Sequence, residues 1–225
     1  MESKSNKEIF SEIYAKKLWG KTDKGRGYKE PFFSGSGSHN ETIIVPYMNL
    51  LLQIIRNNNI RLITDLGCGD FWIMRNVLSA LSKNNYAFFY NGVDVVEDLI
   101  KYNSETFNDP FIKFHCMDAA QDDTELPFGE MLIIRQVLQH LKNSDIQKIL
   151  SKIKAFKFVL ITEHIYEGID RILNIDKPTD NGTRVDFKSG VYIEKPPYNL
   201  KNIVHLLRVE EGGGIIRSSL IINEI

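Results

Sequence analysis

The 225-residue sequence has only two cysteines, Cys68 and Cys116, which are too few for a disulfide framework or a Cys-rich zinc site. It also lacks a long apolar run, and its N-terminal residues are polar, so we expect no membrane span and no secretory signal. Lys and Arg number 28 against 29 Asp and Glu, and the formal net charge of −1 lacks the basic excess typical of nucleic-acid-binding proteins. The sequence therefore predicts a cytoplasmic protein that binds neither nucleic acid nor a membrane.

Short apolar stretches alternate with stretches of helical spacing after Ile60. The expected strands are 61–67, 86–94, 111–118, 131–136 and 156–162, and the expected helices between them are 71–82, 96–107 and 137–155. This alternation favours βαβ units and a parallel sheet with right-handed crossovers. We therefore expect an α/β domain over 59–225, with 1–58 forming helices and a lid over it as part of one structural unit.

The two ends of the sequence depart from the alternating pattern. Residues 202–210 and 214–225 are strand-like and are joined by Glu211 and a run of glycines, which predicts an antiparallel hairpin. The hairpin would complete a mostly parallel sheet of seven strands. Apolar residues at helical spacing predict N-terminal helices over 6–19 and 43–57.

A glycine turn follows the first expected strand. Gly67 and Gly69 follow shortly after Asp65, and glycine allows the sharp turn and close backbone approach that a ligand needs there. A dinucleotide-binding turn requires a third glycine at position 72, which is Trp72 in this chain. The sequence therefore disfavours a turn that binds the pyrophosphate of a dinucleotide.

Acidic residues end the next two expected strands. Asp94 ends the second, where a carboxylate can accept hydrogen bonds from both hydroxyls of a ribose, and Asp118 ends the third, where an adenine amino group can donate to it. Each acid alone is more often a helix cap or a loop residue. Together with Asp65 they place an acid at three successive strand ends, which favours a nucleoside site.

These segments carry a family resemblance. The chain reads DLGCGDF after the first strand, GVDVVEDLI after the second, RQVLQHL after the fourth and PPYNL late in the sequence. It resembles the class I S-adenosylmethionine-dependent methyltransferases, which have a Rossmann-like fold, and within them a bacterial branch associated with surface-polysaccharide and small-molecule methylation. Gln136 departs from the branch, which has Asp at that position.

The resemblance implies S-adenosylmethionine as the cofactor and assigns its contacts by position. The implied contacts are Asp65, Gly67, Cys68 and Gly69 at the methionine part, Asp94 and Val95 at the ribose, Asp118 and Ala119 at the adenine, and Arg135 and Gln136 near the sulfonium.

The segment after the first helix is rich in glycine, serine and aromatic residues. Tyr14, Trp19 and Tyr28 can present aromatic faces to a sulfonium or an adenine. Ser36 and Gly37, within the run SGSGS, can donate hydrogen bonds to a carboxylate. We expect an ordered cover over the cofactor, and the alternative is a core tryptophan followed by a flexible tether.

Three residues near the ends of the fourth and fifth strands are candidates for a general base. His140 follows the fourth strand, and histidine titrates near neutral pH, although a histidine in an apolar stretch is commonly a core residue. Glu163 and His164 directly follow the fifth strand at the rim of the same crevice. An alcohol acceptor needs such a base, whereas an anionic oxygen does not.

The irregular segments contain the candidate residues for binding the acceptor. Arg26, Tyr28 and Arg184, in the irregular segments, are the candidate substrate-binding residues. No metal is expected, because the fourth strand ends without the carboxylate of a Mg²⁺-organised site. We expect O-methylation of a small polar or anionic acceptor such as a surface (capsular) polysaccharide precursor or its phosphate-type modification. The alternatives are an unrelated small metabolite as acceptor and a catalytically silent partner subunit that binds the cofactor.

Overall fold

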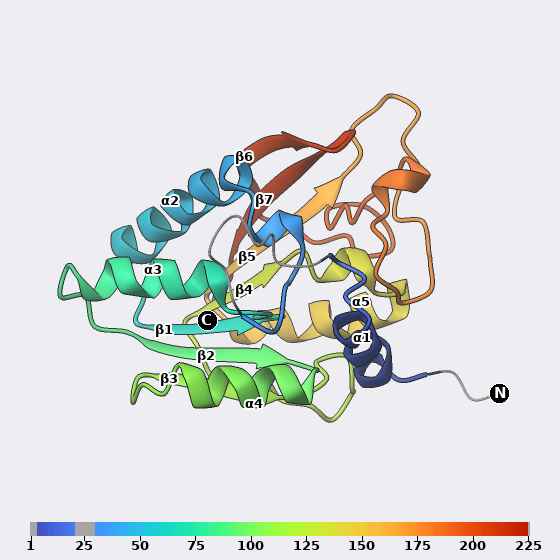
Figure 1. Ribbon diagram of the computed structural model, residues 1–225. Coiled ribbons are helices and arrows are strands. Elements are labelled where there is room, and N and C mark those ends of the chain that lie inside the picture. Colours follow the sequence, from blue (N-terminus) through green and yellow to red (C-terminus); the bar gives the residue numbers. More distant parts are fainter. Residues whose placement is uncertain (1–3, 21–29, 225) are drawn as a thin grey trace.

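The computed structural model describes residues 4–20 and 30–224 (Figure 1). Its helices are α1 (Asn6–Ala15), α2 (Glu41–Asn57), α3 (Trp72–Ser82), α4 (Glu97–Thr106) and α5 (Asn143–Lys152). Its strands are β1 (Leu62–Leu66), β2 (Phe89–Asp94), β3 (Ile112–Cys116), β4 (Met131–Arg135), β5 (Phe158–Ile165), β6 (Ile203–Glu211) and β7 (Gly214–Ile222). No helix among the described residues is long and apolar enough to cross a membrane.

The strands form one sheet in the order β3-β2-β1-β4-β5-β7-β6. The first five pair in parallel, and β7 pairs antiparallel to both β5 and β6. The predicted mostly parallel sheet with an antiparallel C-terminal hairpin is therefore confirmed. The strand order reverses between β1 and β4, and ligands of open α/β sheets bind at the carboxyl ends of the strands beside such a reversal.

Alternate residues of the central strands face opposite layers of the molecule. Ile133 and Leu160 pack in the core that includes α2 and α3, whereas Leu132 and Ile161 pack in the core that includes α5. Figure 1 shows α2 and α3 lying side by side. Because both faces are covered, the strands read as continuous apolar runs in the sequence.

Helix α1 is defined at both ends by local interactions. Ser5 and Glu8 form a capping box, in which each side chain bonds the other residue's backbone N–H. The helix ends at Ala15, because Lys17 adopts a left-handed conformation (φ 54°) that an α-helix cannot contain. The predicted helix over 6–19 is therefore shorter than expected.

The predicted continuous helix over 137–155 is wrong. A 3₁₀ turn, Leu138–His140, is followed by extended backbone, and α5 begins only at Asn143. The Glu163 carboxylate accepts hydrogen bonds from three backbone N–H groups at the start of this segment, and Arg184 donates to three of its carbonyls. Arg184 therefore occupies carbonyls that a helix over 137–155 would have paired, and Glu163 binds N–H groups at the start of the segment.

Candidate functional site

A cavity of about 320 Å³ opens at the carboxyl ends of β1, β2 and β4. Its wall includes Gly67 after β1, Asp94 at the end of β2 and Gln136 after β4. Residues of α1 and the segment 34–38 line its other side. The cavity therefore lies at the reversal of strand order, where the sequence predicts the ligand site.

The glycine turn lies in close contact with the end of β2 and with the loop after β4. Gly67 and Gly69 have φ values of 75° and 53°, which favour glycine. The backbone N–H groups of Gly67 and Cys68 both donate to the Val93 carbonyl, at 2.8 and 3.0 Å. A Cβ atom at Gly67 would lie 2.2 Å from Cγ2 of Val137. The turn is thus fixed against β2 and the loop after β4.

Asp94 lines the cavity, and its carboxylate has hydrogen-bond acceptor sites that the protein does not use. Its Oδ2 accepts from the Gly69 N–H and its Oδ1 from the Val96 N–H, both at 3.1 Å. An ionised carboxylate has about four lone-pair sites, so about two remain for a ligand. Burial raises the pKa of Asp94 to about 6. The spare sites match the two hydroxyl groups of a ribose.

Asp65 and Cys68 lie behind the glycine turn. They line a neighbouring cavity of about 40 Å³ and are absent from the wall of the large one. Asp65 accepts a hydrogen bond from the Tyr90 hydroxyl at 2.8 Å, and burial raises its pKa to about 7. The structure therefore does not bring these two predicted cofactor contacts to the large cavity.

Asp118, Val95 and Ala119 also line the cavity. The Asp118 carboxylate accepts from the Ala120 N–H at 2.9 Å and from the Asn6 side chain of α1 at 3.2 Å. The described part of the chain has no group of three or more His, Cys, Asp or Glu that could hold a metal ion. Asp118 thus joins the N-terminal helix to the cavity wall.

Described residues of the N-terminal segment line the cavity. Tyr14, Trp19, Ser36 and Gly37 all line it. Trp19 donates from Nε1 to the Asn181 carbonyl at 3.1 Å, which links the cover to the loop between β5 and β6.

Arg135 holds the serine-glycine segment against the end of β4. Its guanidinium donates to the Gly37 carbonyl at 2.7 Å and to Oε1 of Gln136 at 3.0 Å, and it lies 5.0 Å from the ring centroid of Tyr47. A Cβ atom at Gly37 would lie 2.4 Å from the Gln136 side chain. Arg135 and Gln136 both line the cavity, and their polar groups position the cover.

Three residues that the sequence analysis did not single out connect the cover to the glycine turn. The Asp70 carboxylate accepts from the Ser34 N–H at 2.8 Å and from Nε2 of His39 at 2.7 Å. The Ser34 hydroxyl in turn accepts from the Asp70 N–H at 2.8 Å. Asp70 is visible in the sequence as the acid that ends the turn, but its partners lie more than thirty residues away.

His140 is buried against the cover. Its Nδ1 lies 3.1 Å from the Gly182 carbonyl, which can only accept, so Nδ1 carries the proton. Its Nε2 therefore accepts from the Gln139 amide at 3.2 Å, and its ring centroid lies 5.1 Å from that of Trp19. Burial lowers the pKa of His140 to about 4. Both ring nitrogens are thus occupied by the protein.

Replacing His140 by glutamine is expected to flatten the fall in unfolding free energy between pH 6.5 and about 4. In the unfolded chain the imidazole protonates near pH 6.5, whereas the buried ring stays neutral until about pH 4. The contribution of His140 to the unfolding free energy is therefore complete above pH 6.5 and is lost as the pH falls toward 4. Burial raises the pKa of Asp65 and Glu163, which acts in the opposite direction, but both remain in the variant. Urea denaturation of both proteins across this range is the test, and equal slopes would contradict it.

Glu163 and His164 lie at the end of β5, but only His164 lines the cavity. Glu163 is 3% exposed and accepts from the N–H groups of the turn after β4, while burial raises its pKa to about 7. It is absent from the cavity wall, which places it as a positioning residue. His164 does line the cavity, and its Nε2 donates to the Glu211 carbonyl at 2.9 Å, leaving the lone pair on Nδ1.

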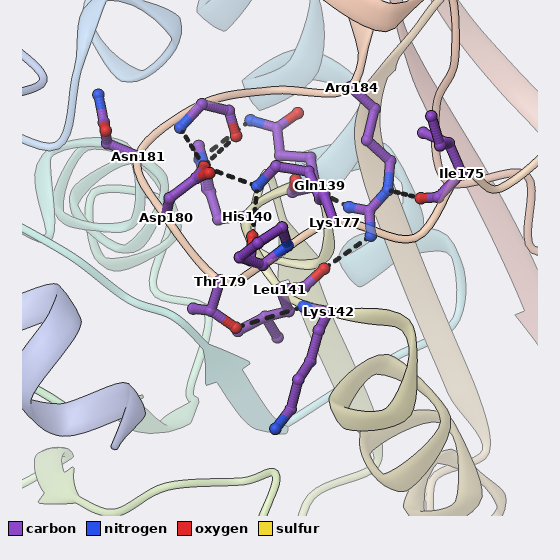
Figure 2. Close-up of polar contacts among 12 residues, drawn as sticks. Gln139, His140, Leu141, Lys142, Ile175, Lys177, Thr179, Asp180, Asn181 and Arg184 are labelled. Carbon is purple, nitrogen blue, oxygen red and sulfur yellow. Dashed lines mark hydrogen bonds and ion pairs between the residues drawn. The ribbon is translucent and has the colours of Figure 1, made fainter. Parts of the chain in front are cut away.

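Arg184 is a structural residue, which corrects the prediction that it binds substrate (Figure 2). It is completely buried, and its guanidinium donates to four backbone carbonyls and to Oδ1 of Asn143. Those bonds use its donors within the chain, so none is left for a ligand. The other two predicted substrate-binding residues, Arg26 and Tyr28, lie outside the described residues.

The chain matches no protein-family model and no curated protein. It does resemble solved structures. N-methyltransferase NodS from Bradyrhizobium japonicum WM9, in complex with S-adenosylhomocysteine, is 11% identical with a TM-score of 0.60, covering 94% of this chain and 98% of NodS.

Two further structures extend this similarity. Magnesium protoporphyrin IX methyltransferase ChlM from Synechocystis PCC 6803, with bound S-adenosylmethionine, is 12% identical with a TM-score of 0.57 and full coverage of both chains. The methyltransferase domain of bacterial CtHen1 is 16% identical with a TM-score of 0.53, covering 78% of this chain and 97% of that domain. The chain therefore has the Rossmann-like fold of the class I S-adenosylmethionine-dependent methyltransferases.

Proposed function

We propose that this protein binds S-adenosylmethionine and transfers its methyl group to an oxygen of a small polar or anionic acceptor. The observation that carries the proposal is the Asp94 carboxylate, which lines a cavity at the reversal of strand order and keeps about two acceptor sites for ribose hydroxyls. The fold of the solved methyltransferases supports the same cofactor.

The cavity residues fit the parts of this cofactor. Asp94 and Val95 would hold the ribose, Asp118 and Ala119 would flank the adenine, and Gly67 with the cover would surround the methionine part; all of these residues line the cavity. When bound, S-adenosylmethionine supplies an activated methyl group, so the chain need not generate an electrophile. Its remaining tasks are to align the acceptor, to exclude water and to accept a proton.

His164 is the residue we propose as the general base for a hydroxyl acceptor. In the tautomer fixed by the Glu211 carbonyl its Nδ1 carries the lone pair, and the residue lines the cavity. His140 is the weaker base, because its pKa is lowered by burial and its Nε2 already accepts from Gln139. We propose that His140 instead positions Trp19 over the site.

The remaining alternatives concern the acceptor and the presence of turnover. An anionic acceptor oxygen would need no base, and an unrelated small metabolite is as compatible with the cavity as a sugar. Surface-polysaccharide precursors come from the sequence resemblance, and the comparisons do not support them, so they enter as test acceptors only. A silent cofactor-binding subunit would bind S-adenosylhomocysteine without transferring methyl groups.

Methyl transfer from radiolabelled S-adenosylmethionine to a panel of hydroxyl acceptors tests the proposal. His164→Gln is expected to lower turnover at least about a hundredfold with S-adenosylhomocysteine affinity unchanged, because only the proton acceptor is lost. His205→Gln is the matched control, since His205 lies on β6 and bonds Ser219 instead. Full activity of His164→Gln would refute the assignment of the base, and cofactor binding without turnover on any acceptor would favour the silent subunit.

A further inference from the structure

Strand β5 extends beyond the end of its neighbour β4 in the sheet. Arg135, the last residue of β4, lies opposite Thr162, and the Gln136 N–H donates to the Thr162 carbonyl at 2.7 Å. Because β4 ends there, it supplies no acceptor for the His164 N–H. Oε1 of the Gln139 side chain accepts from that N–H at 3.1 Å instead. A side chain of the turn after β4 therefore completes the hydrogen bonding at the end of β5.

The two ends of the Gln139 amide bind different histidines. A backbone N–H can only donate, so the amide oxygen faces His164 and the amide nitrogen faces His140. That nitrogen lies 3.2 Å from Nε2 of His140, which accepts because Nδ1 carries the proton for the Gly182 carbonyl. The direction of the amide is therefore fixed independently by a backbone group on each side.

The backbone of Gln139 is held as firmly as its side chain. The residue is 3% exposed, its N–H donates to the Glu163 carboxylate at 3.0 Å, and its carbonyl accepts from Arg184 at 2.8 Å. Buried polar networks rigidify the residues that they join when their groups are satisfied. Gln139, His140 and His164, which all line the cavity, therefore form one hydrogen-bonded unit.

Resting on the proposed function, we propose that Gln139 is a positioning residue for methyl transfer. One end of its amide holds the backbone of His164, the proposed base, and the other end holds the His140 ring, whose centroid lies 5.1 Å from that of Trp19. The side chain thus couples the placement of the base to that of the aromatic cover. A displacement of about 1 Å in a catalytic group can cost about a hundredfold in rate.

Two substitutions of similar size separate the hydrogen bonds of Gln139 from its volume. Gln139→Met removes both bonds, whereas Gln139→Glu keeps an oxygen for the His164 N–H and can share a proton with Nε2 of His140. Gln147→Met, at an exposed position of α5, is the matched control. In radiolabelled methyl transfer, Gln139→Met is expected to lower kcat about tenfold or more, with S-adenosylhomocysteine affinity unchanged within about twofold. Gln139→Glu is expected to restore most of the rate.

NMR spectroscopy of the two histidines tests the unit without turnover. The wild-type protein at neutral pH is expected to show the neutral Nδ1–H tautomer of His140 and a protected His164 amide. Hydrogen exchange of that amide is expected to become about tenfold faster in Gln139→Met and to stay slow in Gln139→Glu. The charges that act on the His140 ring, those of Lys177, Asp180 and Arg184, are the same in every variant.

The outcomes separate the role of Gln139 from the proposed function. An Nε2–H tautomer of His140 in the wild-type protein, or equal exchange of the His164 amide in wild type and Gln139→Met, would overturn the hydrogen-bonded unit and the inference with it. Full turnover of Gln139→Met, or a loss of cofactor affinity as large as the loss of rate, would overturn the positioning role. Absence of wild-type turnover on every acceptor would overturn the proposed methyl transfer and the role of Gln139 in it, whatever the NMR spectra show of the unit.

Discussion

Replacing Arg184 by methionine is expected to lower the free energy of unfolding by about 3 kcal/mol or more. The substitution removes the guanidinium donors of the Gln139, Leu141 and Ile175 carbonyls, and the Leu138 carbonyl keeps only the Leu141 N–H. Each unsatisfied buried polar group costs about 1 to 3 kcal/mol, and methionine fills much of the volume but donates no hydrogen bond. Urea denaturation followed by circular dichroism measures the change.

Arg171→Met is the matched control for this variant. Arg171 lies in the same irregular segment but is exposed, so its loss is expected to change stability by less than about 0.5 kcal/mol. A similar small effect for Arg184→Met would contradict the structural role assigned to Arg184 and would reopen its role in substrate binding.

Replacing Asp94 by alanine is expected to weaken binding of S-adenosylhomocysteine more than about tenfold. The variant loses the acceptor for two ribose hydroxyls, and a hydrogen bond to a charged group contributes about 1.5 to 3 kcal/mol, where 1.4 kcal/mol is a factor of ten. It also removes the acceptor of the Gly69 and Val96 N–H groups, which shape the turn. Isothermal titration calorimetry measures the affinity.

Two further variants make the result interpretable. Asp98→Ala, on the first turn of α4, removes a carboxylate that the cavity wall does not include and is expected to bind normally. Asp94→Asn keeps an oxygen for the backbone N–H groups, so a loss of affinity there reports on the ligand rather than on folding. Wild-type affinity in both Asp94 variants would remove the ribose assignment.

The fold and one side of the site could be predicted from the sequence because they depend on local pattern. Buried parallel strands leave continuous apolar runs, and the residues that end them, such as Asp94 and Asp118, meet at one edge of the sheet. A residue at the carboxyl end of a predicted parallel strand can therefore be placed at this edge of the sheet from the sequence alone. Asp94 and Asp118 both line the cavity, in keeping with that rule.

The same rule fails where side chains distant in sequence decide the local structure. The segment around Leu138–His140 has helical spacing, but Arg184 binds the carbonyls that an α-helix would have paired, and only a 3₁₀ turn forms there. Asp65 lies near the end of β1, yet its carboxylate accepts a hydrogen bond from Tyr90 behind the turn. Arg184 was expected to contact a ligand, but it is completely buried and has a structural role. The periodicity of the sequence does not reveal such burial.

Titration of the purified protein with S-adenosylhomocysteine, with NADH as the comparison ligand, tests the central claim most directly. The cavity at the carboxyl ends of β1, β2 and β4 predicts one binding site per chain for the nucleoside and no comparable binding of the dinucleotide. No heat of binding with S-adenosylhomocysteine at millimolar concentration, or equal affinity for NADH, would contradict the account.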